Sequence, residues 1–293
     1  MAIPKPLADF LCAENAWKPL PKSVLLLGRQ TMPFGIETLE ALAKKWNLSV
    51  GKVEFDSQTQ FAKLNQTNKW ITDKTFFQML GVEQIRAIDH TDYEGADIIL
   101  DLCEPIPPEY EGQFDFIFNG SVLDNVFDIA SALLNIGRLL APGGRVVHVE
   151  TATTCAYSYS AISPSWFFDY ATVNNWADCK VYMGTAGNLA GLTSGPWGMM
   201  AFDPTASKRP NAFTCDLGSD LGVQVIIGEK GEGSTWNKKP VQSHYRSDND
   251  WAQFIKLVEN IRSSRRPLHK GDGATGERNH VSPDGAWVNC GWW

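Results

Sequence analysis

The sequence predicts an α/β fold in which a mostly parallel sheet carries helices on both faces. Residues 114–150 hold a short apolar run, then apolar residues at helical steps of three and four, then a second apolar run at 145–149. Proline and glycine at 142–144 separate the helix from this second run. Two parallel strands need such a crossover helix. Residues 23–28 add a continuous apolar run, which is typical of a strand buried on both faces.

Length and composition restrict the class of protein. The chain has 293 residues, of which 43% are hydrophobic, and can therefore bury a large core. A net charge of −7 gives no basic footprint for nucleic acid. The first residues lack the pattern of a secretion signal, and no apolar stretch is long enough to cross a membrane. The six cysteines stand singly, without a metal-binding pair. We expect a soluble cytoplasmic protein with reduced thiols and no metal.

The remaining elements divide the chain into three parts. We expect an N-terminal arm at 1–22, a main domain at 23–230 and a C-terminal extension at 231–293. Within the main domain, residues 36–46 have the spacing of a helix, and 50–80 form a helical insertion that either packs on the domain or covers a site. Residues 179–184 and 223–228 are the expected last strands, paired antiparallel. The extension contains one amphipathic helix, 251–261.

The aromatic end of the chain, GAWVNCGWW, is too apolar to stay in water. We expect it to pack on the domain or on a second subunit, so that a homo-oligomer stays open as an alternative.

Two expected strands end in an acid. The run at 85–89 ends at Asp89, and the run at 96–101 ends at Asp101. In nucleotide-binding α/β folds, a carboxylate at the end of the second strand accepts hydrogen bonds from the ribose hydroxyls. A turn-initiating aspartate is the alternative for either residue alone. Two consecutive strands with terminal acids favour a nucleotide-like ligand.

These segments resemble a known enzyme family. The series of Asp89, YEGADIILDLCEPIP, FDFIFNGSVLDNVFD and LLAPGGRVVHVE is similar to class I S-adenosylmethionine-dependent methyltransferases, in particular the small-molecule and sugar-type branch. The resemblance covers roughly residues 23–150, with a weaker match at 163–174, where family members often place a substrate-facing helix. It implies a Rossmann-like seven-stranded sheet, mostly parallel with an antiparallel edge strand. It also implies S-adenosylmethionine as cofactor and a small-molecule substrate.

The resemblance further implies contacts between strand ends and the cofactor. The implied residues are Gly28, Arg29 and Gln30 at the methionine part, Asp89 at the ribose, Asp101 and Leu102 at the adenine, and Asn119, Gly120 and Ser121 at the sulfonium. The chain departs from the family at the first loop. The family's glycine-rich motif is replaced by LLGRQTM at 26–32, whose bulkier residues let the backbone approach a cofactor less closely.

Methyl transfer from a sulfonium requires alignment of the acceptor and, for some acceptors, removal of a proton. The candidate catalytic residues near the strand ends are Asp124, His148 and Glu150, with His244 from the C-terminal part. Each has a structural alternative. His148 lies inside a strand and fits a core histidine, and Asp124 fits a helix cap. Glu150 follows the strand at its carboxyl edge and has the better access to substrate.

Two functions from different classes fit the sequence. The first is transfer of a methyl group to a sugar, a nucleotide-sugar or another small metabolite. The second is a non-catalytic member of the fold, which binds a nucleotide-like ligand or a partner protein. A nicotinamide-dependent enzyme is a weaker third candidate, because the chain has no GxGxxG motif.

Overall fold

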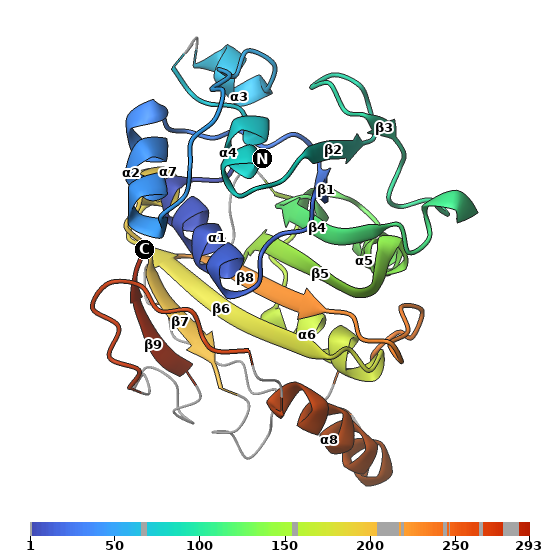
Figure 1. The fold of residues 1–293 in the computed structure, drawn as a ribbon. Helices are drawn as coiled ribbons and strands as arrows, with labels where there is room; N and C mark the ends of the chain where they lie inside the picture. Colours follow the sequence, from blue (N-terminus) through green and yellow to red (C-terminus); the bar gives the residue numbers. More distant parts are fainter. Residues whose placement is uncertain are drawn as a thin grey trace.

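The computed structural model describes residues 2–65, 69–153, 158–203, 217, 220–242, 245, 247–263, 266–277 and 287–293. Over these residues the chain builds one nine-stranded sheet, which Figure 1 shows from one side. The strands, in sheet order, are β3 (Ile98–Ile99), β2 (Gln84–Asp89), β1 (Ser23–Leu27), β4 (Phe114–Gly120), β5 (Leu140–Thr151), β8 (Leu221–Glu229), β6 (Asp178–Ala186), β7 (Gly198–Phe202) and β9 (Trp287–Trp292).

The order of the strands places a switch point between β1 and β4. The pairings from β3 through β2, β1 and β4 to β5 are all parallel. The chain builds outward from β1 in one direction with β2 and β3, and in the other with β4 and β5. In open α/β sheets of this kind, ligands bind at the carboxyl ends of the strands where the order reverses.

The predicted number of strands was wrong. The sheet has nine strands, not seven, because β7 and β9 extend it beyond β6. The antiparallel strand β8 lies inside the sheet, between β5 and β6, and β7 also pairs antiparallel with β6. The predicted antiparallel pairing of residues 179–184 with 223–228 is confirmed. The aromatic end packs on the domain as expected, since β9 pairs with β7.

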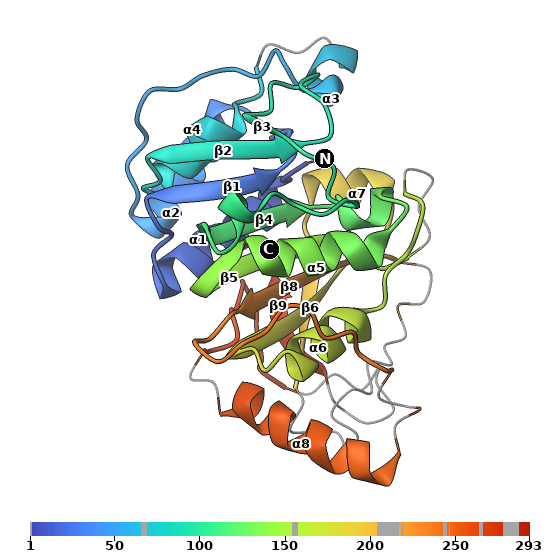
Figure 2. The same cartoon turned by 90° about the vertical axis from the view of Figure 1, so that its right-hand side faces the viewer.

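Helices cover both faces, as predicted. The helices are α1 (Lys5–Trp17), α2 (Ile36–Trp46), α3 (Gln60–Leu64), α4 (Asp73–Met79), α5 (Ile129–Leu139), α6 (Pro164–Val173), α7 (Leu189–Ser194) and α8 (Asp248–Arg262). Buried residues of α1, α2 and α4 share one hydrophobic cluster, and those of α5, α6 and α8 share another. Figure 2 shows α5 and α6 in front of the sheet, with α8 below them.

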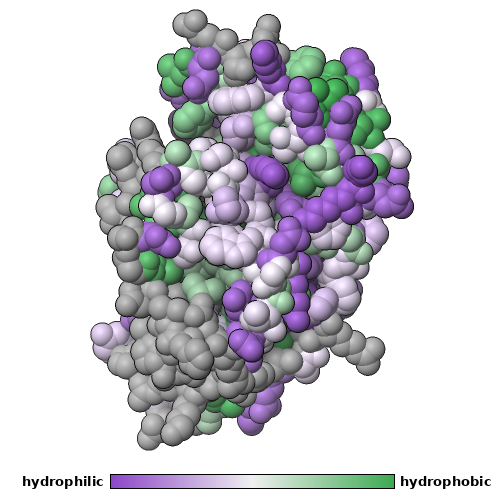
Figure 3. Space-filling view, turned by 90° about the vertical axis from the view of Figure 1, so that its left-hand side faces the viewer, coloured by the Kyte–Doolittle hydropathy of each residue, from purple (hydrophilic) through white to green (hydrophobic). Residues whose placement is uncertain are grey.

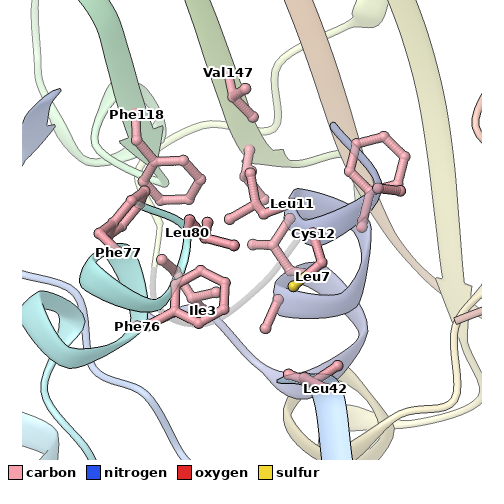
Figure 4. Packing of buried hydrophobic residues seen from close by; sticks show 14 of the residues in the cluster. Ile3, Leu7, Leu11, Cys12, Leu42, Phe76, Phe77, Leu80, Phe118 and Val147 are labelled. Atoms are coloured by element: carbon pink, nitrogen blue, oxygen red, sulfur yellow. The ribbon is translucent and has the colours of Figure 1, made fainter. Parts of the chain in front are cut away.

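Strand alternation divides these two clusters. In β1, Leu26 belongs to the first cluster, whereas Leu25 and Leu27 belong to the second, since successive strand residues point to opposite faces. Figure 4 shows side chains of α1 and α4 converging on Phe118 of β4 and Val147 of β5 in the first cluster. Residues 1–22, expected as an arm, thus contain a helix that is buried against the sheet.

The boundaries of three predicted elements differ from the prediction. The helix that was expected to start near Val122 begins at Ile129, after Asp128 accepts a hydrogen bond from the Ser131 amide. The residues before it form a 3-10 turn, Leu123–Asn125, because their polar groups bond to strand ends instead. The third strand shortens from 96–101 to β3, and 142–144 lie within β5.

The insertion at 50–80 is helical, as predicted, and combines buried and exposed apolar residues. Phe76 and Phe77 of α4 are fully buried in the first cluster. Phe55, Phe61 and Leu64, at and before α3, remain exposed. Figure 3 shows the side of the molecule on the left of Figure 1, where hydrophobic side chains form separate groups among hydrophilic ones. The packing alternative therefore holds for α4.

A buried carboxylate ties α1 to both halves of the chain. Glu14 is completely buried and accepts hydrogen bonds from Arg145 of β5 at 2.5 Å, Arg266 at 2.5 Å and His269 at 2.7 Å. Burial by itself raises the pKa of Glu14. The hydrogen bond from His269 and the charges of Arg266 and Arg145 outweigh burial, so the pKa falls to about 2. Ionised Glu14 therefore stabilises the fold.

We expect Glu14→Gln to lower the free energy of unfolding by about 3–5 kcal/mol, because the buried Arg145 guanidinium loses the carboxylate with which it pairs and Arg266 loses one of its three acidic partners. In the unchanged protein, the contribution of ionised Glu14 to stability is fully present above pH 4.5. It declines as pH falls toward about 2, since the folded pKa of Glu14 lies below the unfolded one. Urea unfolding at several pH values measures both effects. Glu40→Gln, at an exposed site of α2, is the control and is expected to change neither.

Candidate functional site

Polar side chains gather where β4 and β5 end. Asn119 of β4 lies beside His148 of β5 in the parallel register. The Asn119 side-chain amide nitrogen is 2.5 Å from Glu150 Oε1, to which it donates, and 2.9 Å from His148 Nδ1. Asn119, His148 and Glu150 occupy one face of the sheet because they alternate with the buried residues of the opposite face. One amide thus connects two of the predicted catalytic residues.

Asp124 closes this group from the turn after β4. Its carboxylate accepts hydrogen bonds from Ser121 Oγ at 2.7 and 2.8 Å and from Thr151 Oγ1 at 2.6 Å. Its backbone amide donates to Glu150 Oε2 at 3.2 Å. Ser121 has a φ of 65°, in the left-handed region that side chains seldom adopt. We call Asn119, Ser121, Asp124, His148 and Glu150 the strand-end cluster. The sequence predicted all five as site residues, and the fold brings them together.

Burial shifts the pKa values of two residues of the strand-end cluster, Glu150 and His148. Glu150 and Asp124 are 0% exposed and His148 is 3% exposed. Burial, reinforced by the negative charge of Asp124, raises the pKa of Glu150 well above its usual range. Burial lowers the pKa of His148 to about 3, so its ring is neutral near pH 7. The ring also packs on Phe167 of α6, with centroids 4.8 Å apart. These side chains are satisfied by protein groups.

A polar cavity of about 270 Å³ lies at the carboxyl end of β1. It is lined by Arg29 and Gln30, which directly follow β1, and by residues 54–59 and 72–74 of the insertion. We call it the switch-point cavity, because β1 borders the reversal in strand order. The insertion therefore forms a wall of the cavity as well as packing on the sheet. Sequence reasoning missed these wall residues, since they lie on the chain far from β1.

Acidic residues hold the Arg29 side chain in place. Its Nη2 is 2.7 Å from Asp97 Oδ2, and its Nη1 is 3.8 Å from Asp73 Oδ1. Asp73 Oδ2 also accepts a hydrogen bond from the backbone amide of Gln30 at 3.0 Å. Two buried atoms of the cavity lining have no hydrogen-bond partner, Arg29 Nη1 and Gln30 Oε1. Of these atoms, Arg29 Nη1 still lies in an ion pair with Asp73, and Gln30 Oε1 lies against Gly120 of β4.

The position of the Gln30 side chain also explains why residue 120, at the end of β4, is a glycine. Its Nε2 donates to the carbonyls of Leu27 at 3.0 Å and Gly28 at 3.1 Å. Its Oε1 lies where a Cβ on Gly120 would be, so no larger residue fits at 120 while Gln30 keeps this position. Gly28 has a φ of 68°, which favours glycine. The three residues form a tight contact between the ends of β1 and β4.

The two predicted nucleotide-binding acids lie side by side at the next strand ends. Asp89 ends β2 and accepts from the His90 amide at 2.7 Å. Asp101 follows β3, accepts from the Cys103 amide at 2.8 Å and lies 3.6 Å from His90 Nδ1. Leu102 beside it is buried. Neither acid lines the switch-point cavity. His244 lies outside the described residues.

The part of the chain that the structure describes offers neither a cluster of metal ligands nor a membrane-spanning helix. There, no group of three or more His, Cys, Asp or Glu residues could hold a metal ion. Likewise, none of the helices described combines the length and apolar character that crossing a membrane requires.

No protein-family model and no curated protein sequence matches this chain. Among solved structures, a methyltransferase from Thermotoga maritima, described as a possible histamine N-methyltransferase, is 13% identical, with a TM-score of 0.38; the match covers 76% of this chain and 92% of that one. Phosphoethanolamine N-methyltransferase 2 from Haemonchus contortus is 11% identical, with a TM-score of 0.40, covering 78% and 54%.

A protein described as a Zn-dependent alcohol dehydrogenase, from Rhodobacter sphaeroides, is 14% identical, with a TM-score of 0.28; the match covers 50% of this chain and 46% of that one. The chain thus spans about half the length of two of these three structures. At these values, only the sheet order and side chains of the chain itself carry an assignment of function.

We expect Glu150→Gln to remove a pH dependence of stability. Because the pKa of Glu150 is higher in the folded state than in the unfolded state, Glu150 makes its full contribution to stability below its unfolded pKa. This contribution is lost as pH rises through the folded pKa. The variant cannot ionise at this position, so its stability relative to the unchanged protein should increase as pH rises above the usual pKa of a glutamate, about 4.5. Thermal unfolding across this range measures the difference. Glu109→Gln, at an exposed site, should leave the pH dependence as it was.

Proposed function

We propose that the protein transfers a methyl group from S-adenosylmethionine to a small-molecule acceptor. The switch-point cavity carries this proposal. Among its lining residues, Arg29 has a guanidinium that matches an α-carboxylate, and Gln30 has an amide oxygen that matches an α-ammonium group. The methionine part of S-adenosylmethionine has both groups on one carbon. The cavity also lies at the reversal in strand order, where this class of sheet binds ligands.

The adenosine part would be held by the strand ends beyond β1. We assign the ribose hydroxyls to the Asp89 carboxylate and the adenine to Asp101 and Leu102. In support, β2 and β3 pair in parallel, with Asp89 opposite Ile99, so both acids stand at the same edge of the sheet. Leu102 supplies a buried apolar surface beside them. The side chains of both acids bond only to neighbouring backbone or lie near His90, and can turn toward a ligand.

When bound, the cofactor supplies an electrophilic methyl group. Of the strand-end cluster, half-buried Ser121 is the residue that we assign to the acceptor side, together with Gly120 and Asn119. Asp124 accepts the Ser121 hydroxyl proton in a hydrogen bond and orients it. We assign Glu150 and His148 to positioning, because each is buried and bonds to the Asn119 amide. They hold the loop and do not contact the reacting atoms.

The second candidate is ligand binding without catalysis, and the contact between Gln30 and Gly120 favours it. The Gln30 side chain fills space that the family's glycine-rich loop leaves open. Arg29 likewise is largely engaged by Asp97. The first candidate requires S-adenosylmethionine in the switch-point cavity, whereas the second binds a nucleotide-like ligand or a partner protein. They differ in whether a methyl group leaves the cofactor.

Isothermal titration calorimetry with S-adenosylhomocysteine tests both candidates. We expect binding, and we expect Asp89→Ala to weaken it by roughly 1–3 kcal/mol, the cost of losing a hydrogen bond to a charged group. Asp92→Ala, in the exposed loop after β2, serves as the control and should bind as the unchanged protein does. Absence of binding at millimolar ligand would contradict the proposed function. Binding without methyl transfer to any of a panel of small acceptors would support the second candidate.

A further inference from the structure

We propose that a groove between α5 and α6 binds an uncharged, ring-containing small molecule. The groove has a volume of about 590 Å³ and lies away from the residues of the switch-point cavity. It is lined by the first two turns of both helices, by residues 160–163 and by the segment around Pro240. α5 and α6 lie next to each other on the face seen in Figure 2. Its volume is within the range of small-molecule sites, roughly 300–1,000 Å³. The inference concerns binding alone and does not depend on the proposed function.

The walls of the groove are apolar although they face solvent. Ile129 and Leu134 of α5 and Trp166 of α6 pack on the core from one side and stay partly exposed on the other. The Trp166 ring lies edge-on to Phe167, with centroids 5.9 Å apart, so its position is fixed by the core. A flat ring between these side chains would remove apolar surface from water on both of its faces.

Two exposed aromatic residues are close in sequence to residues that line the groove. Phe127, two residues before Ile129, is 96% exposed, and Tyr159, next to the lining residue Ser160, is 78% exposed. Exposed apolar surface beside a concave site is typical of a binding surface.

The charges in the lining favour an uncharged ligand. Asp169 and Lys239 are the acidic and the basic residue among the lining side chains, so their formal charges cancel. The other polar groups include the Ser163 and Ser165 hydroxyls, which lie 2.9 Å apart at the start of α6. Hydroxyls of this kind can bond to one polar substituent on a ring.

The wall at 160–162 is fixed by the strand-end cluster, so the groove is formed before a ligand arrives. The Ser160 amide donates to the Asp124 carbonyl at 3.2 Å, and the Ile162 amide donates to the Thr151 carbonyl at 3.3 Å. The Ile162 carbonyl accepts from the side chain of Gln224 on β8. A preformed wall lowers the entropy cost of binding. It also makes the groove a neighbour of Asp124.

Nuclear magnetic resonance of isotope-labelled methyl groups tests the inference, with indole as the ring probe and hexanol as an acyclic comparison. We expect indole to shift the methyl signals of Ile129, Leu133, Leu134 and Ile162, and hexanol to bind more weakly. Ala130 lines the groove and is exposed, so Ala130→Trp should fill the groove without disturbing the core. We expect this variant to bind indole at least about tenfold more weakly, about 1.4 kcal/mol.

The matched control is Ala252→Trp, at an exposed position of α8, which should keep the affinity of the unchanged protein. The inference is overturned if indole leaves the four methyl groups unshifted, if Ala130→Trp binds indole as tightly as the control does, or if hexanol binds as tightly as indole. Sedimentation at several protein concentrations tests a second copy of the chain as the occupant. Concentration-dependent association that Ala130→Trp abolishes would also overturn the inference. Binding of S-adenosylhomocysteine to both variants separates this result from the proposed function.

Discussion

The hydrogen bond between Asn119 and Glu150 is the contact on which the candidate site depends. A carboxyl group buried at the end of β5 is costly unless nearby donors satisfy it, and the Asn119 amide and the Asp124 backbone supply them. Satisfying Glu150 in this way fixes the turn after β4. The same turn then delays the start of α5 and holds Ser121 at the surface. The need of the buried Glu150 carboxyl group for hydrogen-bond donors thus determines the conformation of the loop after β4.

After β1, the chain has Arg29 and Gln30 where the methyltransferase family has a glycine-rich loop. Arg29 and Gln30 do not merely replace glycines, because their side chains turn into the protein and build the floor of a polar cavity. The insertion supplies the opposite wall. In this arrangement side chains provide the donor and the acceptor that a glycine-rich loop would offer from its backbone. Under the proposed function, the acids that position Arg29 would also govern the affinity for the methionine part of the cofactor.

A second buried carboxylate, Glu14 of α1, connects the N-terminal helix to β5 and to the C-terminal segment. Glu14 pairs with Arg145 of β5 and with Arg266, which lies 252 positions away in the chain. Without Glu14, the buried Arg145 would lose the carboxylate with which it pairs, and Arg266 would keep Asp178 and Glu229 but lose its third acidic partner. The N-terminal helix and the C-terminal segment are for this reason parts of one core, although composition suggested an arm and an extension.

By itself, the sequence determined the first five strands, the helix at 36–46, the acids at the strand ends and the five residues of the strand-end cluster. These features follow from local apolar runs, turn residues and the rule that parallel strands end at one edge. Only the tertiary structure decided that β7 and β9 extend the sheet, that His148 and Glu150 are buried, and that the insertion lines the cavity at β1. Each of these outcomes depends on contacts between segments far apart in the chain, and local patterns carry no information about which distant side chain will satisfy a buried polar group.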